Sequence, residues 1–261
     1  MEIARLERVG GVLLLFESGR RLDPESVRKI VDKSGRVSIS LDPRQSPDRP
    51  AADPASDGAL EWLELLIGGM TFDLVGLAPG RPVNLPDIRH RVSLPEEAIQ
   101  ATCEALCLVP GPHLAGGANT IPVVRTLFEL IALLAADMGP QLRTICWPPA
   151  ALATGPEFFR SQAESWQKSG AFPSRILAGY RQMSDGGLQS EGLAFFTGQE
   201  IRIEPESVGD CSTAVQLASR LVQQLAQHGP LTQSEEVIAP DGGQMRLVPS
   251  GNGKFVRVWR N

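Results

Sequence analysis

Two copies of one tripeptide, 116 residues apart, most constrain how this chain can fold. Gly76-Leu77-Ala78 and Gly192-Leu193-Ala194 each end a strand-like run and precede an amphipathic helical pattern. With this offset, the helical apolar spacing around Leu106 coincides with the apolar spacing around Val222. The pattern favours an internal repeat of two related halves, and two unrelated α+β units are the alternative.

The expected elements follow a similar order in both halves. In the first half, strands are expected at 12–16, 37–41, 59–67 and 70–77, and helices at 24–33 and 93–108. In the second half, strands are expected at 143–147, 174–182, 188–196 and 200–204, helices at 155–168 and 210–228, and three short strands at the end. This order predicts an α+β fold of two similar strand-helix-strands-helix units, in which mostly antiparallel sheets carry helices on one face.

Local signals support several of these boundaries. Asp23-Pro24-Glu25 supplies an N-cap, a proline at the first helical position and a first-turn acid. Ser93-Leu94-Pro95-Glu96 has the spacing of a capping box, and Gly68-Gly69 is typical of a hairpin turn. Segment 42–58 is rich in proline and aspartate and has almost no apolar side chain larger than alanine, so we expect a mobile loop there.

Residues 121–138 are apolar on nearly every side, which predicts a helix buried at the centre of the protein. The segment is too short for a membrane span, and it carries Arg125, Glu129 and Asp137. We therefore expect an N-terminal unit at 1–115 and a C-terminal unit at 116–261 that includes this central helix.

Charge and composition limit the partners and the compartment. The formal net charge is −5 and the pI is about 5.4, whereas a nucleic-acid-binding domain needs clustered basic residues. The apolar run at 12–16 is too brief for a signal peptide or a membrane anchor. We expect a soluble cytoplasmic protein with no nucleic-acid or membrane partner, and the sequence leaves the oligomeric state open.

The four cysteines, Cys103, Cys107, Cys146 and Cys211, follow the expected helices and strands and form no disulfide framework. We expect free thiols, with Cys103 on the core face of helix 93–108. Cys103 and Cys107 together with His113 would supply three zinc ligands, but a structural zinc site needs four and usually a second close pair. The sequence therefore predicts no metal, and it contains no cofactor motif.

The second half also carries a family resemblance. The residues are Cys146-Trp147-Pro148-Pro149, the helix with Phe158, Gly192-Leu193-Ala194-Phe195-Phe196 and Gln199-Glu200-Ile201. In spacing and in these residues, the chain from about 73 to 259 resembles the bacterial domain of unknown function 4261 family. In this family a glycine-containing segment usually precedes the glutamate, and the corresponding residues here are Thr197-Gly198-Gln199. The resemblance implies a fold and a bacterial source, and it supplies no activity and no functional residue.

One candidate anion site lies at the start of the central helix. Gly116-Gly117-Ala118-Asn119-Thr120 enters that helix, and Arg125 lies in its early turns. Exposed N–H groups of Gly116, Gly117, Asn119 and Thr120, together with the helix dipole, are suited to a phosphate or a carboxylate. The loop lacks the lysine of a P-loop and does not follow a strand, so a plain loop with an N-cap is the alternative.

Cys146 is the candidate nucleophile, because it ends a strand and precedes a helix. No histidine is assigned to it by the sequence, and a buried structural cysteine is the alternative. The basic triplet Arg89-His90-Arg91 is more typical of a solvated strand or loop than of an anion clamp.

Two classes of function follow from these observations. Three histidines, the single tyrosine Tyr180 and the absence of a catalytic motif favour a non-enzymatic protein that binds another protein, as an accessory or immunity-like factor. The alternative is a small-molecule or anion-binding protein, or a hydrolase, with a cleft near 116–120 and Cys146. A deep pocket with convergent polar groups favours the alternative, and a large exposed apolar patch favours the interaction protein.

Overall fold

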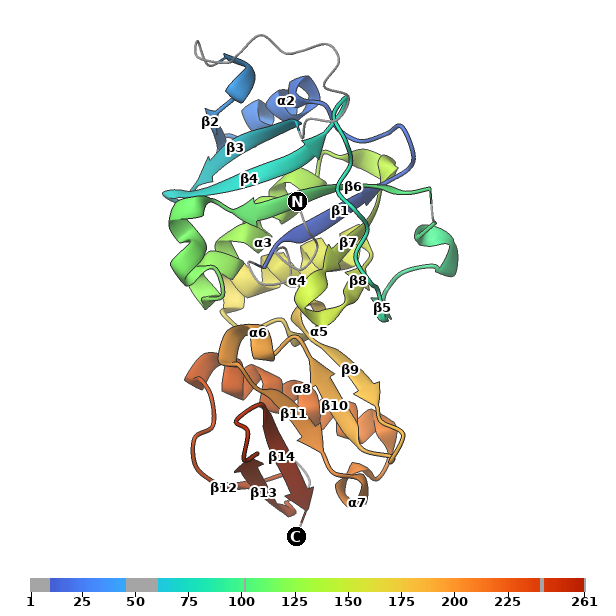
Figure 1. Ribbon diagram of the computed structural model, residues 1–261, viewed down its shortest axis with the longest axis vertical. Coiled ribbons are helices and arrows are strands. Elements are labelled where there is room, and N and C mark those ends of the chain that lie inside the picture. Colours follow the sequence, from blue (N-terminus) through green and yellow to red (C-terminus); the bar gives the residue numbers. More distant parts are fainter. Residues whose placement is uncertain (1–9, 46–60, 101, 240–241, 261) are drawn as a thin grey trace.

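The computed structural model describes residues 10–45, 61–100, 102–239 and 242–260. In this part of the chain, helices pack against two mostly antiparallel sheets, one above the other in Figure 1. The predicted α+β class is thereby confirmed.

The first sheet has eight strands in the order β2-β3-β4-β6-β1-β7-β8-β5. They are β1 (Val12–Phe16), β2 (Ser38–Leu41), β3 (Glu61–Ile67), β4 (Met70–Leu77), β5 (His90–Val92), β6 (Glu104–Pro110), β7 (Leu142–Trp147) and β8 (Leu152–Thr154). All neighbouring pairs are antiparallel except β5 and β8. The central strand β1 is wholly apolar and wholly buried, because both faces of the sheet are covered.

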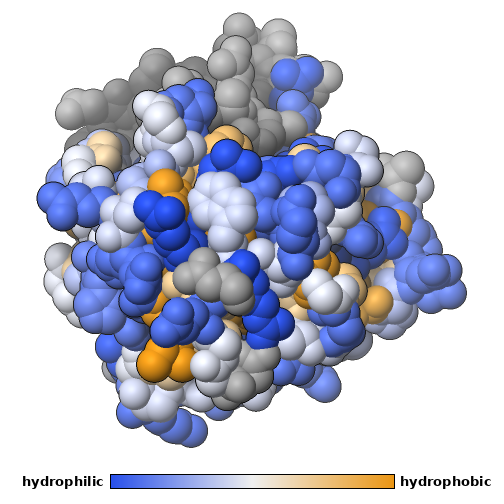
Figure 2. Space-filling model, turned by 90° about the horizontal axis from the view of Figure 1, so that it is seen from below, coloured by the Kyte–Doolittle hydropathy of each residue, from blue (hydrophilic) through white to orange (hydrophobic). Residues whose placement is uncertain are grey.

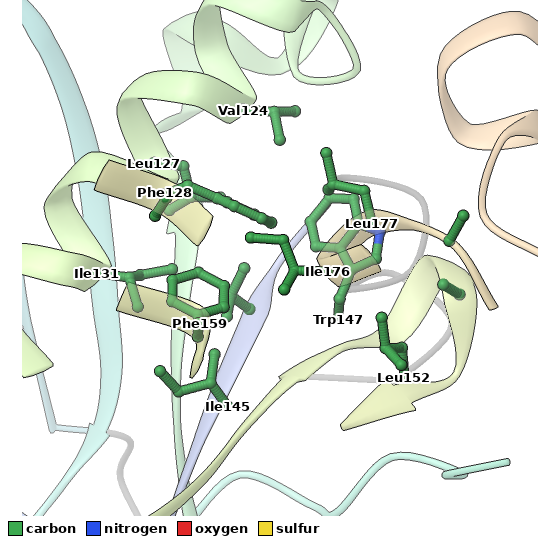
Figure 3. Close-up of a cluster of buried hydrophobic side chains, with 14 of the residues drawn as sticks. Val124, Leu127, Phe128, Ile131, Ile145, Trp147, Leu152, Phe159, Ile176 and Leu177 are labelled. Carbon is green, nitrogen blue, oxygen red and sulfur yellow. The ribbon is translucent and has the colours of Figure 1, made fainter. Parts of the chain in front are cut away.

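Three helices cover one face of this sheet: α2 (Pro24–Ser34), α3 (Ile121–Ala135) and α4 (Pro156–Ser169). α2 begins as predicted, with the Asp23 carboxylate accepting a hydrogen bond from the Ser26 N–H group. α3 is the predicted central helix. Its Phe128 ring lies 4.9 Å from the Phe159 ring of α4 and 5.4 Å from the Trp147 ring at the end of β7, measured between ring centroids. Figure 3 shows these three rings converging in the core.

The chain between β4 and β6 covers the opposite face. It contains β5 and the short turn η2 (Glu96–Ala98), and in Figure 1 it crosses in front of the sheet. Val83 belongs there to a second, smaller core, and the partly buried Leu85 and Ile88 pack against it. The central members of this core are Leu13, Leu15, Val75, Ala105, Cys107, Val109, Cys146 and Ala153.

The second sheet has six strands in the order β12-β13-β14-β11-β10-β9. They are β9 (Gly179–Gln182), β10 (Leu188–Glu191), β11 (Glu200–Ile203), β12 (Glu235–Ile238), β13 (Gln244–Pro249) and β14 (Phe255–Arg260), and only β11 and β14 are parallel. The long helix α8 (Cys211–His228) packs against this sheet, and Asp210 caps it by accepting from the Ser212 and Thr213 N–H groups. One continuous cluster of buried apolar side chains joins the two sheets.

Short elements complete the fold. They are the turns η1 (Pro43–Gln45), η3 (Pro112–Gly117), η4 (Gly139–Gln141) and η5 (Pro148–Ala150) and the helices α5 (Ser174–Leu177), α6 (Ala194–Thr197) and α7 (Pro205–Val208). Among the described residues, no helix has the length and apolar character needed to cross a membrane.

The prediction of a helix at 93–108 is wrong. This segment contains η2 and most of β6, which pairs with β1 on one side and with β4 on the other. A strand that is buried on both faces is apolar at every position, so its apolar run also matches a helical pattern. Cys103 and Cys107 therefore do not lie on a helix, and Cys103 is only partly buried.

Two predicted strands are also shorter than expected. Segment 174–182 begins with α5 and only then forms β9, and segment 188–196 forms β10 and then turns into α6. In the predicted mobile loop 42–58, residues 46–58 lie outside the described residues. Residues 42–45 are held by η1, where the Asp42 carboxylate accepts from Arg28 and Arg44. The hydrogen bond from Arg44 lowers the pKa of Asp42 to about 2.

The internal repeat is not confirmed. Its helix-to-helix match needs a helix at 93–108, and the two sheets differ in strand number and in strand order. The sheets also divide the chain at a later point than the expected boundary at 115, because β7 and β8 complete the first sheet. The first sheet needs these strands to bury β1 from both sides.

Replacing Phe128 with alanine tests the aromatic core. We expect Phe128→Ala to lower the free energy of unfolding by about 3–5 kcal/mol, because it removes a fully buried ring and leaves a cavity. Urea denaturation followed by circular dichroism measures the change. Phe158→Ala is the matched control, since Phe158 is only partly buried on α4, and an equal loss in both variants would contradict this packing.

Candidate functional site

A pocket of about 440 Å³ lies where the two sheets meet. We call it the junction pocket. Its lining residues are Arg89, Ala115, Ala118, Asn119, Pro148, Pro149, Ala194, Phe195 and Glu200. They come from four separate places in the sequence: the residue before β5, the turn before α3, the turn after β7, and α6 with the start of β11. The pocket therefore exists only because both sheets are present.

The Glu200 carboxylate fixes one wall of this pocket. Its Oε1 atom accepts from the N–H groups of Gly192 and Ala194 at 2.8 and 2.9 Å, and its Oε2 atom accepts from the Ser190 hydroxyl at 2.5 Å. These bonds hold the turn between β10 and α6, which presents Ala194 and Phe195 to the pocket.

The charge of Glu200 has no cationic partner among the described residues, because its donors are the Ser190 hydroxyl and the backbone N–H groups of residues 192–194. Burial raises the pKa of Glu200 above its ordinary value and outweighs these hydrogen bonds, which lower it. A partly buried carboxylate of this kind gains stability when a cation approaches it.

Arg89 brings a positive charge to the same pocket. Its Nε atom donates to Glu191 at 3.2 Å and its Nη1 atom to Asp87 at 3.0 Å. Glu191 also lies 2.7 Å from His90 Nε2 and 3.4 Å from Arg181 Nε. Burial raises the pKa of Glu191, but the hydrogen bond from His90 and the charge of Arg89 outweigh burial and lower it. This cluster ties the edge of the first sheet to β9 and β10 of the second.

Close backbone contacts support this arrangement. A Cβ atom on Gly179 would lie 2.1 Å from the His90 ring, so the ring reaches Glu191 only because residue 179 has no side chain. Gly192 has a φ of +107°, and a Cβ atom there would lie 2.7 Å from Ala150. Both glycines let the second sheet approach the first.

Of the predicted anion site, only part reaches the pocket. Asn119 lines it, whereas Gly116, Gly117 and Thr120 do not, and the Thr120 hydroxyl donates to the Gly117 carbonyl instead. Arg125 points elsewhere. Its guanidinium donates to the Trp166 and Gln167 carbonyls and holds the end of α4 against α3.

Cys146 offers no accessible sulfur atom. It is fully buried in the second core, and burial raises the pKa of its thiol far above the ordinary value. The turn that follows it, Pro148-Pro149, does line the junction pocket. The turn beside Cys146 therefore lines a pocket, whereas the Cys146 sulfur atom itself is not exposed to a ligand.

The sequence also gave no indication of a carboxylate pair on the edge half of the first sheet. Asp73 of β4 pairs across the strands with Glu64 of β3, and Asp73 Oδ1 is buried with no hydrogen-bond partner among the described residues. Burial and the charge of Glu64 raise the pKa of Asp73 to about 6, although His113 opposes the shift. The register of the predicted hairpin indicates that Asp73 lies opposite Glu64. The sequence does not indicate that Asp73 Oδ1 is buried.

Comparisons with known proteins give no assignment: no family model, no curated protein and no solved structure matches the chain at a significant level. The resemblance to the bacterial domain of unknown function 4261 family stays a prediction. Five residues of that resemblance line the junction pocket: Pro148, Pro149, Ala194, Phe195 and Glu200. In the described ranges, no group of three or more His, Cys, Asp or Glu side chains could hold a metal ion.

Thiol labelling tests the placement of the cysteines. With Ellman's reagent, we expect Cys211 to react in the native protein because it is exposed, and Cys107 and Cys146 to react only after denaturation because they are buried. The four free thiols should all titrate in denaturant without reductant. Cys211→Ser should remove the fast native phase. Fast native labelling of Cys146 would contradict the buried position.

The pH dependence of stability tests Asp73. Its pKa is raised from 3.8 to about 6 on folding, so the folded state loses stability as the pH rises from about 4 to about 6. Asp73→Asn should therefore raise the free energy of unfolding at pH 7.5 more than at pH 4, as measured by urea denaturation. Asp32→Asn, on the exposed side of α2, is the control. An equal effect of Asp73→Asn at both pH values would argue against the raised pKa.

Proposed function

We propose that the protein binds a small polar molecule in the junction pocket and does not convert it. The observation that carries this proposal is that Arg89 and Glu200, of opposite charge, line one pocket together with Asn119, alanines, prolines and Phe195. Convergent polar groups on an apolar wall are typical of small-molecule sites. A pocket of about 440 Å³ accommodates a metabolite of modest size.

The chemistry around the pocket supports binding over catalysis. His90 lies beside the pocket residue Arg89, but its Nε2 atom is engaged by Glu191. Cys146 is buried away from the pocket, and none of the lining residues is a serine, cysteine, threonine, histidine or lysine. The described lining residues thus supply charges and an aromatic ring, and no pair of nucleophile and base.

Protein interaction is the second candidate function, and one observation favours it. β12 is an edge strand, and its Ile238 side chain is 78% exposed. Among the described residues, the only other exposed large hydrophobic side chain is Leu41 of β2, which lies at the opposite end of the molecule in Figure 1. Figure 2 shows a largely hydrophilic face with small, separate hydrophobic areas. Because the described residues expose only these two large hydrophobic side chains, at separate places, this candidate ranks second.

Filling the pocket tests the first candidate. A metabolite library is screened by thermal shift, and a ligand at 100 times its Kd should stabilise the protein by about 2.7 kcal/mol. Ala194→Trp places a large ring at an exposed position of the pocket wall and should abolish the response to every ligand found.

Ala136→Trp is the matched control, because Ala136 is also exposed and lines other pockets, near α3 and α4. The control variant should respond like the original protein. Ligands that stabilise Ala194→Trp as strongly as the original protein would contradict the proposed site. Capture of a protein partner that Ile238→Lys abolishes and Ala194→Trp leaves intact would favour the second candidate.

A further inference from the structure

We infer that the ligand of the junction pocket is a zwitterion of the α-amino acid class, with its ammonium group on Glu200 and its carboxylate on Arg89. This inference rests on the proposed function and names its ligand. It is based on the hydrogen bonds that the two side chains already make and on those that they leave open.

Glu200 has neutral hydrogen-bond donors and no cationic partner among the described residues. Its Oε1 atom accepts from the N–H groups of Gly192 and Ala194, its Oε2 atom accepts from the Ser190 hydroxyl, and the Leu193 N–H group also stabilises the carboxylate. Because all of these donors are neutral, the negative charge stays uncompensated, and a cationic donor is the partner that offsets it.

An organic ammonium group fits Glu200 better than a metal ion. Magnesium and calcium need about six or more oxygen ligands, usually including several carboxylates. Glu200 is the only acidic residue among the described lining residues, and Asn119 supplies the only amide side chain. An ammonium group has three N–H donors and needs no fixed set of oxygen ligands, so Glu200 can accept one of the donors, and the Phe195 ring in the same wall can also attract the charge.

Arg89 provides the site for the opposite charge. Its Nε and Nη1 atoms donate to Glu191 and Asp87, and its Nη2 atom has no hydrogen-bond partner among the described residues. Two N–H groups of Nη2 thus remain for a ligand carboxylate. A ligand of one charge sign would meet repulsion from either Arg89 or Glu200, whereas a zwitterion is attracted by both.

The apolar residues of the pocket wall indicate the chemistry of the rest of the ligand, apart from its two charged groups. Phe195, Pro148 and Pro149 present carbon surface, and Ala115, Ala118 and Ala194 leave space. A hydrocarbon side chain on the ligand would be removed from water against these residues. We therefore expect an amino acid with an apolar side chain to bind more tightly than glycine.

Isothermal titration calorimetry with defined probes tests the inference. Each of the twenty standard L-amino acids is titrated into the full-length protein, and the tightest binder is then replaced by its N-acetyl derivative and by its carboxamide. Each derivative lacks one charge and should bind roughly 10- to 150-fold more weakly. Glu200→Gln should weaken binding of the free amino acid but not of its N-acetyl derivative, and Arg89→Gln should weaken binding of the free amino acid but not of its carboxamide. Arg143→Gln, outside the pocket, should change neither.

The outcomes separate the inference from the proposed function. The assignment of the ligand as a zwitterion is wrong if the derivatives bind as tightly as the free amino acid. It is also wrong if only other metabolites stabilise the protein and Ala194→Trp abolishes their effect. In both cases the pocket remains a binding site. If no compound responds to Ala194→Trp, both are wrong. Should Glu200→Gln fail to fold, as judged by circular dichroism, the Arg89→Gln variant and the two derivatives still decide the question.

Discussion

The packing of Trp147 is the contact on which the junction between the two sheets depends. Its ring ends β7 in the first sheet and is 2% exposed. It meets the Phe128 ring edge-on on one side, and the Phe195 ring of α6 edge-on at 5.1 Å on the other. Phe196 stacks nearly parallel to it at 6.5 Å. Since aromatic pairs add to the free energy gained by burial, this cluster joins α3 of one layer to α6 of the other.

The polar contacts then set what the junction presents to solvent. Trp147 positions α6, and Glu200 holds the turn in front of α6 through backbone amides. On the opposite side, the Glu191 cluster holds Arg89 at the pocket. A stable apolar contact therefore underlies a pocket whose charges come from different sheets. A ligand that bridges Arg89 and Glu200 would add a third link between the layers and would stabilise them together.

The extent to which the sequence predicts the fold differs among the elements for physical reasons. The apolar helix α3, the Gly68-Gly69 hairpin and the capped starts of α2 and α8 depend on local spacing, which the sequence shows directly. β6 depends on its two neighbours, and its continuous apolar run matches a helix equally well.

Local sequence signals likewise indicate some residues of the junction pocket and not others. Glycines at a helix start indicate the turn before α3, and a strand that ends ahead of a helix indicates the segment after Cys146. Both segments reach the pocket, through Asn119, Pro148 and Pro149. The sequence alone favours a solvated basic triplet for Arg89 and His90. Their partner Glu191 lies about a hundred residues away in sequence, and only the folded chain brings them together. Long-range ion pairs leave no local pattern.

A crystal structure of the protein with its tightest-binding amino acid would test the central claim most directly. The account predicts electron density in the junction pocket, with the ligand nitrogen within about 3.2 Å of Glu200 Oε2 and the ligand carboxylate at a similar distance from Arg89. Density in another pocket, or a ligand whose nitrogen contacts neither oxygen of Glu200, would contradict it.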